Sequence, residues 1–388
     1  MISPILISVV FTIALWFYLR KSFQRNFINS YQWNKKVIFL FDFNILYCTF
    51  FRFLFRYFPN LHASPIFNFL LNFSYVALGF LGLVALILLI IDISHLFELI
   101  YLKAFKNPSE KQNHGRREFL KKSFTLGGLG SSFFITGFGY WSSFSPQINK
   151  VQIKLEDKFK KLSGLKIAQL SDIHLGPTLK QDFASKLVEV TNELNADLIV
   201  ITGDMIDGEV DEIKNEVIPL KDLKAPLGVF YVTGNHEYYW NGIEWINFTR
   251  SLGIIPLINE NRILNFKETQ FALCGVTDLY SRKYDPTNAS DYLKAKQNVS
   301  DDSYKILLAH QPKACFEASK FGYHLQLSGH THGGQGFPWN LIVYLAQPYL
   351  AGLYKHEQMD LFVHKGTGFW GPPNRFIINS EIALIELV

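Results

Sequence analysis

The chain has 388 residues, which is long enough for more than one domain at a usual size of about 150 residues per domain. Hydrophobic residues make up 48% of it and charged residues only 18%, so the composition excludes a disordered chain and indicates a membrane segment. The formal net charge of +5 is unevenly distributed, because residues 1–147 carry +9 and residues 148–388 carry −4. The basic part is the hydrophobic one, which argues against a nucleic-acid-binding surface.

Four hydrophobic segments in the first part of the chain are candidates for membrane-spanning helices, at about residues 2–19, 37–58, 70–91 and 124–144. A helix needs about 20 apolar residues to cross a bilayer, and the first and third segments contain no charge. The second contains Asp42, Arg52 and Arg56, and the fourth is short and glycine-rich, so the sequence predicts three or four spans. We expect residues 1–147 to form a membrane anchor and residues 148–388 to form a separate domain.

Lys and Arg gather in the segments after the first and third candidate spans, whereas residues 59–65 contain none. Cytoplasmic loops carry such an excess, so the pattern predicts an integral membrane protein, of the cytoplasmic membrane if bacterial, whose residues 148–388 are extracytoplasmic. Arg116 and Arg117, followed by an apolar glycine-rich run, resemble a twin-arginine export signal. A plain basic flank of a membrane helix explains the pair equally well, and both interpretations place the domain on the same side.

Short apolar runs alternate with amphipathic segments after residue 150, which is typical of an α/β domain with a buried sheet. We predict a helix at residues 181–194 and strands at residues 151–155, 165–170, 197–202, 229–233, 271–276, 305–309, 325–328 and 382–387. Polar residues follow five of these strands directly: Asp172, His174, Asp204, Asn235, His236, His310, His330 and His332. Ligands bind beyond the carboxyl ends of strands in open α/β sheets, so we expect five loops to bring these side chains together.

The polar set consists of carboxylates, an amide and imidazoles without a thiolate, which suits Mn²⁺, Fe²⁺ or Zn²⁺ better than Ca²⁺. A carboxylate can bridge two metals, and two metals about 3.5–4 Å apart clamp the attacking and leaving oxygens of a phosphoryl displacement. The spacings Asp172-x-His174 and His330-x-His332 place both side chains of each pair on the same side of an extended segment. The pattern therefore predicts a site for two divalent metal ions.

The ordered motifs resemble those of the calcineurin-like metallophosphoesterase superfamily, and the resemblance covers about residues 160–388. The motifs that carry it are Asp172-x-His174, Gly203-Asp204, Gly234-Asn235-His236-Glu237, His310 and Gly329-His330-x-His332. The resemblance implies two packed mixed β-sheets flanked by helices, around a dinuclear centre. One metal would be held by Asp172, His174 and His332, the other by Asn235, His310 and His330, and Asp204 would bridge both. A hydroxide between the metals would attack phosphorus, and His236 would protonate the leaving group or steady the transition state. The hydrophobic segments before the domain resemble the membrane-anchored branch of the superfamily.

Aromatic and apolar residues follow two of the motifs: Tyr238, Tyr239, Trp240 and Trp245, and then Phe337, Pro338, Trp339, Leu341, Ile342 and Tyr344. One interpretation is an apolar rim, with Tyr239 and Trp339 in contact with an amphiphilic substrate such as a phospholipid or a nucleotide-linked lipid pyrophosphate. The other is that these residues belong to the domain core or dock on the membrane helices. Arg375 either binds a substrate phosphate or forms a surface salt bridge. We expect His324, His356 and His364, which match no ligand motif, to be ordinary surface or loop residues.

These observations predict a metal-dependent hydrolase of phosphoester or pyrophosphate bonds. Its expected partners are the lipid bilayer and the substrate of the enzyme, and we expect no nucleic acid among them. The alternative is a membrane-bound metal-binding scaffold or sensor that does not turn over a substrate. Every ligand position of the motifs is present, as is His236, which disfavours the alternative. A transporter is disfavoured as well, because the first and third candidate spans contain no charged residue that would line a pathway.

Overall fold

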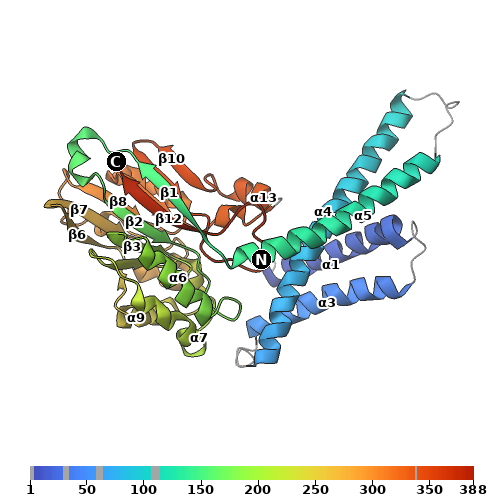
Figure 1. The fold of residues 1–388 in the computed structure, drawn as a ribbon, viewed down its shortest axis with the longest axis horizontal. Helices are drawn as coiled ribbons and strands as arrows, with labels where there is room; N and C mark the ends of the chain where they lie inside the picture. Colours follow the sequence, from blue (N-terminus) through green and yellow to red (C-terminus); the bar gives the residue numbers. More distant parts are fainter. Residues whose placement is uncertain (1–3, 29–34, 58–63, 106–113, 337–338) are drawn as a thin grey trace. The chain divides into compact units, whose positions relative to one another are not determined.

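A computed structural model describes residues 4–28, 35–57, 64–105, 114–336 and 339–388. The chain divides into two compact units, Met1–Phe138 and Gly139–Val388, and each is described by itself below. The division falls slightly before the boundary predicted between residues 147 and 148. In the described part of the chain the first unit is helical, and all of the strands belong to the second (Figure 1).

The first unit contains helices α1 (Pro4–Phe23), α3 (Lys35–Tyr57), α4 (Pro65–Phe105) and most of α5 (His114–Ser143), with a short π-helical turn at Gln24–Ile28. Among the described residues one stretch, Pro65–Tyr101 within α4, is long and apolar enough to cross a membrane. It contains the predicted span at residues 70–91. The other three predicted segments are helical where they are described, but their crossing of a membrane is not confirmed. Residues 2, 3 and 58 of these segments and the side chains of Arg116 and Arg117 lie outside the described part.

Two carboxylates connect the helices of the first unit. Asp42 of α3 accepts a hydrogen bond from Trp16 Nε1 at 2.9 Å and lies 3.1 Å from Arg20 Nε. Asp92 of α4 is bound by four side chains from α1 and the π-helical turn, namely Tyr18, Ser22, Arg25 and Asn26. Charged groups in apolar surroundings are costly unless they are paired, so these contacts hold α1 against α3 and α4.

The second unit is built on two six-stranded mixed sheets. The first sheet has the order β1-β12-β2-β3-β4-β5, with strands Gln147–Ile153, Glu381–Leu387, Lys166–Leu170, Leu198–Thr202, Val229–Val232 and Ile255–Pro256. The second has the order β10-β11-β9-β8-β7-β6, with strands Gly352–His356, Met359–Val363, Leu325–Ser328, Tyr304–Leu308, Thr269–Gly275 and Glu260–Phe266. Strands β2, β3, β4 and β5 are mutually parallel, as are β7, β8, β9 and β11. The predicted pair of mixed sheets is confirmed.

The two sheets pack face to face around a shared apolar layer. Leu198, Val200 and Phe230 of the first sheet and Leu273 and Ile306 of the second are among the buried residues of this layer. Burying apolar area between sheets is the main favourable contribution to such a fold. The layer fixes the two sheets against each other and therefore fixes the loops at their ends.

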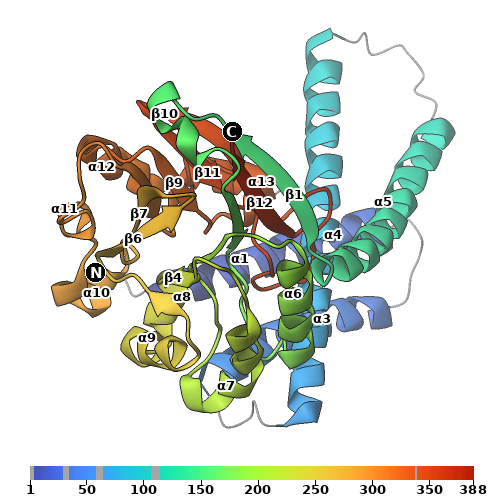
Figure 2. The ribbon, with the colours of Figure 1, turned by 60° about the vertical axis from the view of Figure 1, so that its left-hand side comes forward.

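Helices cover the outer faces of both sheets (Figure 1 and Figure 2). The outer face of the first sheet packs against α6 (Gln181–Glu193), α7 (Val210–Val217) and α9 (Gly242–Ser251). Helix α6 buries Ala184, Leu187, Val188 and Thr191, which recur at the spacing of one helical face. The outer face of the second sheet packs against α11 (Tyr292–Ala295) and α12 (Cys315–Ala318). The predicted helix at residues 181–194 is confirmed as α6.

Four observed strands, β5, β6, β10 and β11, were not predicted from the sequence. β5, β6 and β10 lie at sheet edges. β6 and β10 are exposed or half-buried along their whole length, so these two strands lack an apolar run. β11 is buried but short, and Asp360 interrupts its apolar residues. The first strand starts earlier than predicted because β1 pairs with β12 over its whole length, from Gln147 opposite Glu381 to Ile153 opposite Leu387.

Candidate metal centre

The predicted ligands lie in the loops that follow β2, β3, β4, β8 and β9. Five of them, Asp172, His174, Asp204, His330 and His332, have a positive φ between 49° and 73°. Residues other than glycine seldom adopt this conformation, and such strain gathers at functional sites, where the surrounding structure enforces it. The backbone at these five positions is therefore shaped by the site rather than by local preference.

Glycines allow the loops to approach one another closely. A Cβ atom at Gly234 would overlap the Asp204 carboxylate, and one at Gly329 would overlap Ser171 and the Asp172 carboxylate. Asp172 N–H donates to Gly203 O at 3.0 Å, so the loops after β2 and β3 run side by side. Close backbone approach is what glycine makes possible. The motif glycines at 234 and 329 therefore serve the packing of the site.

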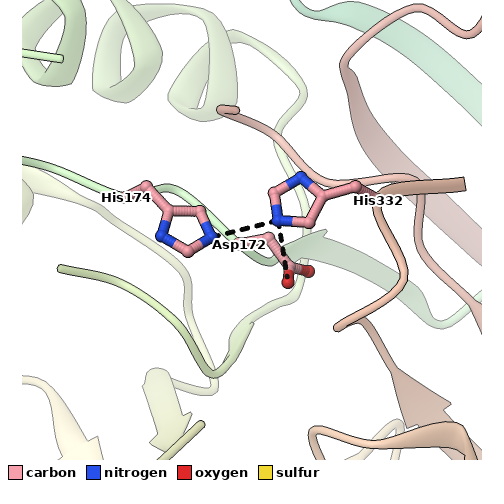
Figure 3. A group of neighbouring side chains, drawn as sticks. All are labelled: Asp172, His174 and His332. Atoms are coloured by element: carbon pink, nitrogen blue, oxygen red, sulfur yellow. Dashed lines mark hydrogen bonds and ion pairs between the residues drawn. The ribbon is translucent and has the colours of Figure 1, made fainter. Parts of the chain in front are cut away.

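Asp172, His174 and His332 form the first group of possible metal ligands, with one ligand atom from each within 4.8 Å of the others. In Figure 3 the rings of His174 and His332 face each other, with the Asp172 carboxylate beside the His332 ring. The two Nε2 atoms are 3.0 Å apart, and His332 Nε2 is 3.5 Å from Asp172 Oδ1. Burial, followed by the Arg375 guanidinium, holds the pKa of His332 well below its ordinary value. His332 is therefore a neutral imidazole, which is the form that binds metals.

Asp204, His310 and His330 form a second group of this kind. His310 Nε2 lies 3.2 Å from Asp204 Oδ2 and 3.2 Å from His330 Nδ1. His310 Nδ1–H donates to Thr202 O at 2.8 Å, which directs Nε2 towards the site. Metal-ligating histidines are commonly oriented through their other ring nitrogen in this way. Burial lowers the pKa of His330 to about 3, so this ring is also neutral.

Asn235, the remaining predicted ligand, carries a buried side-chain oxygen, Oδ1, without a hydrogen-bond partner. This residue is the first of α8 (Asn235–Tyr239), which begins soon after β4. A buried polar atom without a partner costs about 1–3 kcal/mol, so native structures rarely leave one unsatisfied. A cation at this position would satisfy the Asn235 oxygen. The residues present therefore fit a divalent metal ion.

Asp204, a member of the second ligand group, also contacts the candidate acid, His236. Its Oδ1 accepts the backbone N–H of His236 at 2.8 Å, and its Oδ2 is 3.9 Å from His236 Nε2. Burial opposes the charged form of this carboxylate, but His310 and His236 outweigh it and hold the pKa of Asp204 well below its ordinary value. Asp204 is therefore an anion at neutral pH, as a carboxylate ligand to cations must be.

Sequence reasoning missed Asp207, which completes a third group with His174 and His236. Its Oδ2 is 3.0 Å from His174 Nδ1, and its Oδ1 is 2.5 Å from His236 Nδ1. Burial disfavours the charged carboxylate, but the two imidazoles outweigh it and lower the pKa of Asp207. Burial likewise opposes protonation of His236, but Asp204 and Asp207 raise its pKa to about 9. The only sequence signal for Asp207 is its position three residues after Asp204.

Glu237, the last residue of the Gly234-Asn235-His236-Glu237 motif, connects two of the site's loops. Its buried carboxylate accepts the backbone N–H groups of Gly234, Asp204 and Met205, at 2.6, 3.1 and 2.7 Å. These contacts fasten the loop after β4 to the loop after β3. Glu237 therefore holds Asn235 and Asp204 in register.

Arg375 is fully buried, so the predicted surface salt bridge is wrong. Its Nη1 donates to His332 O at 2.9 Å and to Lys365 O at 2.6 Å, and its Nη2 donates to Gly368 O and lies 2.9 Å from His332 Nδ1. Because these contacts occupy both terminal nitrogens, the structure favours a positioning role for Arg375 over the predicted phosphate contact. Arg375 holds His332 and the loop after β11.

The aromatic residues after the two motifs divide between the two interpretations, the domain core and the apolar rim. Trp245 is completely buried and Tyr238 is 6% exposed, so both belong to the core, and Trp240 packs against that core. Tyr239 lies beside the candidate acid, with its ring centroid 5.1 Å from that of His236. Tyr344 is exposed, whereas Phe337, Pro338 and the side chains of Trp339, Leu341 and Ile342 lie outside the described residues.

The three histidines without a ligand motif take different positions. His364 is a loop residue, as one half of the expectation had it, directly after β11, but it is completely buried rather than at the surface. His324 and His356 are half-buried. His324 contacts the rings of Phe159 and Tyr304, and His356 contacts Tyr349, so neither belongs to the three ligand groups.

Comparison with known proteins identifies relatives of this chain among the metallophosphoesterases. The model of the calcineurin-like phosphoesterase family matches residues 165–334, a range that contains all of the candidate metal ligands. A Helicobacter pylori protein called an uncharacterized metallophosphoesterase is 40% identical over 284 residues, which cover 71% of this chain and 73% of that one. A Danio rerio transmembrane protein with metallophosphoesterase domain is 38% identical over 251 residues, 62% of this chain and 57% of that one. Among solved structures, a Thermus thermophilus 5'-nucleotidase precursor aligns over 57% of this chain and 54% of its own, with 14% identity and a TM-score of 0.38.

Proposed function

Because this chain belongs to the calcineurin-like phosphoesterase family, we propose that it is a hydrolase of phosphoester or pyrophosphate bonds with a dinuclear metal centre. The observation that carries the proposal is the presence of two ligand groups in loops at strand ends. One group consists of Asp172, His174 and His332, and the other of Asp204, His310 and His330. Nitrogen and oxygen donors without a thiolate suit Mn²⁺, Fe²⁺ or Zn²⁺.

In this proposal Asn235 would join the second group, and the carboxylate of Asp204 would be a ligand shared by the two groups. Two bound ions supply Lewis acidity, which lowers the pKa of water and neutralises charge on the phosphoryl oxygens. The protein residues hold the site rigid: Arg375 and Thr202 orient His332 and His310, and Glu237 fastens the loops that carry Asp204 and Asn235. Such support keeps the donor atoms in place before substrate arrives.

His236 is the proposed acid for the leaving group. Its Nδ1 is held by Asp207, so Nε2 is the atom that faces the site beside Asp204. With a pKa of about 9, its ring carries a proton at neutral pH. A positioned acid of this kind protonates a departing alkoxide oxygen as the bond to phosphorus breaks.

We propose that residues 1–147, which include the first unit, are a membrane anchor and that residues 148–388 are the extracytoplasmic catalytic domain. Support comes from the apolar stretch Pro65–Tyr101 and from the relative described as a transmembrane protein. A phosphoester or pyrophosphate on a membrane-associated lipid is the substrate class that this location favours. Protease treatment of intact and of lysed cells tests the side: residues 148–388 should be cleaved from outside without lysis.

The function is tested with the purified full chain in detergent, after chelation and addition of Mn²⁺, Fe²⁺ or Zn²⁺. Release of phosphate or alcohol is measured over monoesters, diesters and lipid pyrophosphates. Asp204→Asn should abolish turnover, whereas Asp211→Asn, at an exposed carboxylate of α7, is the matched control and should not. Full activity in Asp204→Asn contradicts the proposal. Metal binding to the wild type without any turnover supports the scaffold or sensor alternative instead.

A further inference from the structure

The last turn of α5 contacts the loop after β11, residues 364–380, which carries Arg375. The backbone oxygen of Gly139 accepts the N–H of Arg375 at 3.1 Å. Three residues further on, Ser142 Oγ donates to Asn379 Oδ1 at 3.1 Å. Gly139 and Ser142 belong to the second unit, whereas most of α5 belongs to the first. The helix that leads from the first unit into the second therefore ends against a loop of the candidate metal centre.

Glycine at position 139 permits a close approach between α5 and this loop. A Cβ atom at Gly139 would overlap Oδ1 of Asn374, which is buried, and would lie 3.3 Å from the backbone nitrogen of Arg375. A Cβ atom at Gly137, two residues earlier, would meet no atom of the described residues within 4 Å. Glycine inside a helix is costly relative to alanine. At position 139 the contact with the loop gives this cost a structural reason.

Aromatic packing continues the same contact into the core. The ring of Phe144, directly after α5, lies 5.4 Å from that of Phe369 between their centroids, at an interplanar angle of 75°. Phe369 is buried in the apolar cluster of the outer face of the first sheet, and Phe144 packs against that cluster. The N–H of the neighbouring Gly368 donates to the backbone oxygen of Asp172, a candidate ligand, at 3.0 Å. The loop therefore contacts α5 on one side and the first ligand group on the other.

Arg375 connects the two contacts. Its backbone N–H is held by Gly139, and its guanidinium donates to His332 O at 2.9 Å and lies 2.9 Å from His332 Nδ1. With Nδ1 held in this way, Nε2 of His332 is the atom that faces the first ligand group, 3.0 Å from His174 Nε2. The second ligand group is supported elsewhere, by Thr202 on His310 and by Glu237 on the backbone of Asp204.

We propose that the last turn of α5 is a positioning element of the first ligand group, in which Gly139 holds Arg375 and Arg375 holds His332. This extends the proposed function and rests on it, because it concerns a metal at Asp172, His174 and His332. It makes the affinity of one of the two metals depend on the helix that leads from the proposed membrane anchor. Outer contacts that orient a ligating histidine typically change metal affinity by about 10- to 100-fold.

A plain docking contact between α5 and the domain is the competing interpretation. Disturbing such a contact would lower the stability of the fold, and the two metals would then be weakened alike. A positioning role weakens binding at the first ligand group and leaves the second group unchanged. The ratio of the two metal affinities therefore separates the interpretations, whereas stability alone does not.

The test uses Gly139→Ala in the full chain in detergent, with Mn²⁺ titrated after chelation and followed by calorimetry. We expect one of the two metals to bind roughly tenfold more weakly and the other to keep its wild-type affinity. Gly137→Ala makes the same change where a Cβ atom is free of contacts with the described residues, so this matched control should bind both metals as the wild type does.

The overlapping side chain offers a rescue. Asn374→Ala removes the atom that a Cβ at position 139 would overlap, so the double variant Gly139→Ala/Asn374→Ala should regain most of the lost affinity. Hydrogen exchange of the metal-free chain gives a readout that needs no metal. Residues 364–380 should exchange faster in Gly139→Ala than in the wild type or Gly137→Ala.

Three results overturn the inference: two unchanged affinities in Gly139→Ala, an equal weakening of both metals, or a double variant that binds no better than Gly139→Ala. The hydrolysis assay separates the inference from the proposed function. Turnover by the wild type, together with unchanged metal binding in Gly139→Ala, contradicts the inference alone. Selective weakening of one metal in a chain that hydrolyses no ester supports the inference and contradicts the hydrolase.

Discussion

Asp207 Oδ1 lies 2.5 Å from Nδ1 of His236, and this contact fixes the orientation of the candidate acid. The other oxygen of the same carboxylate lies 3.0 Å from Nδ1 of His174, a candidate metal ligand. One half-buried carboxylate therefore orients two imidazoles with different tasks. A change at Asp207 is expected to affect both proton transfer and metal binding.

Asp207→Asn should lower kcat by about 10- to 100-fold, the usual cost of losing the partner that orients a functional histidine. The amide cannot match the charge of the carboxylate, so the pKa of His236 should fall from about 9 towards its ordinary value. The measurement is a pH profile of kcat for wild type and variant, with Asp211→Asn as control. An unchanged profile would contradict the role given to Asp207.

The acid role of His236 predicts a dependence of activity on pH. Burial opposes protonation of the ring, but Asp204 and Asp207 raise its pKa to about 9, so the acid form persists through neutral pH. We expect kcat to hold up to about pH 9 and to fall above it as the proton is lost. His236→Gln should abolish this alkaline limb, and a limb that persists in that variant belongs to another group.

The same pKa predicts how His236 affects stability. Some groups have a higher pKa in the folded chain than in the unfolded chain. Such a group stabilises the fold fully at a pH below its pKa in the unfolded chain, and this stabilisation is lost as the pH rises through its pKa in the folded chain. For His236 this range runs from its ordinary value of 6.5 to about 9. Thermal melting of the metal-free chain should show the difference in Tm between wild type and His236→Gln shrinking between these two pH values. A difference that stays constant or grows across the range contradicts this linkage.

Arg375→Ala should lower the free energy of unfolding of the second unit by at least about 2 kcal/mol, because His332 O, Lys365 O and Gly368 O lose their buried donors. Metal affinity should fall with it, since His332 loses its support. Arg375→Lys should not restore either property, because a single ammonium does not reproduce the planar fork of the guanidinium. The readouts are denaturant melts and metal titration. A raised KM with unchanged stability and metal affinity would instead support the substrate contact expected from the sequence.

Asp92→Leu should loosen α1 from α4 in the first unit. The substitution leaves Arg25 without its carboxylate at 2.5 Å and removes the acceptor used by Ser22 and Asn26. Hydrogen bonds to charged groups contribute about 1.5–3 kcal/mol each, so thermal unfolding in detergent should begin at a lower temperature. Asp92→Asn retains an acceptor and should show a smaller effect. Equal melting of all three proteins would mean that the Asp92 contacts do not hold the helix.

Local sequence pattern was sufficient for the strands that carry the site. Apolar runs mark β2, β3, β4, β8 and β9, and the polar residues at their ends identify the candidate ligands, because a strand of a buried sheet carries its signal in its own residues. The uncharged stretch in α4 is recognisable for the same reason. The order of the motifs then indicated the family, and the comparisons support it.

Long-range packing assigned the remaining polar and aromatic residues to the site or to the core. A surface position was one of the two interpretations of Arg375, but packing buries this residue against His332. An apolar rim was one of the two interpretations of Trp245, but this residue lies in the core. Asp207 gains its role from two histidines in other loops, and Trp370 reaches His236 across the fold. Such roles arise from contacts between residues far apart in the chain, so the burial, charge and neighbours of a side chain are set by the packing of both sheets and not by its local sequence.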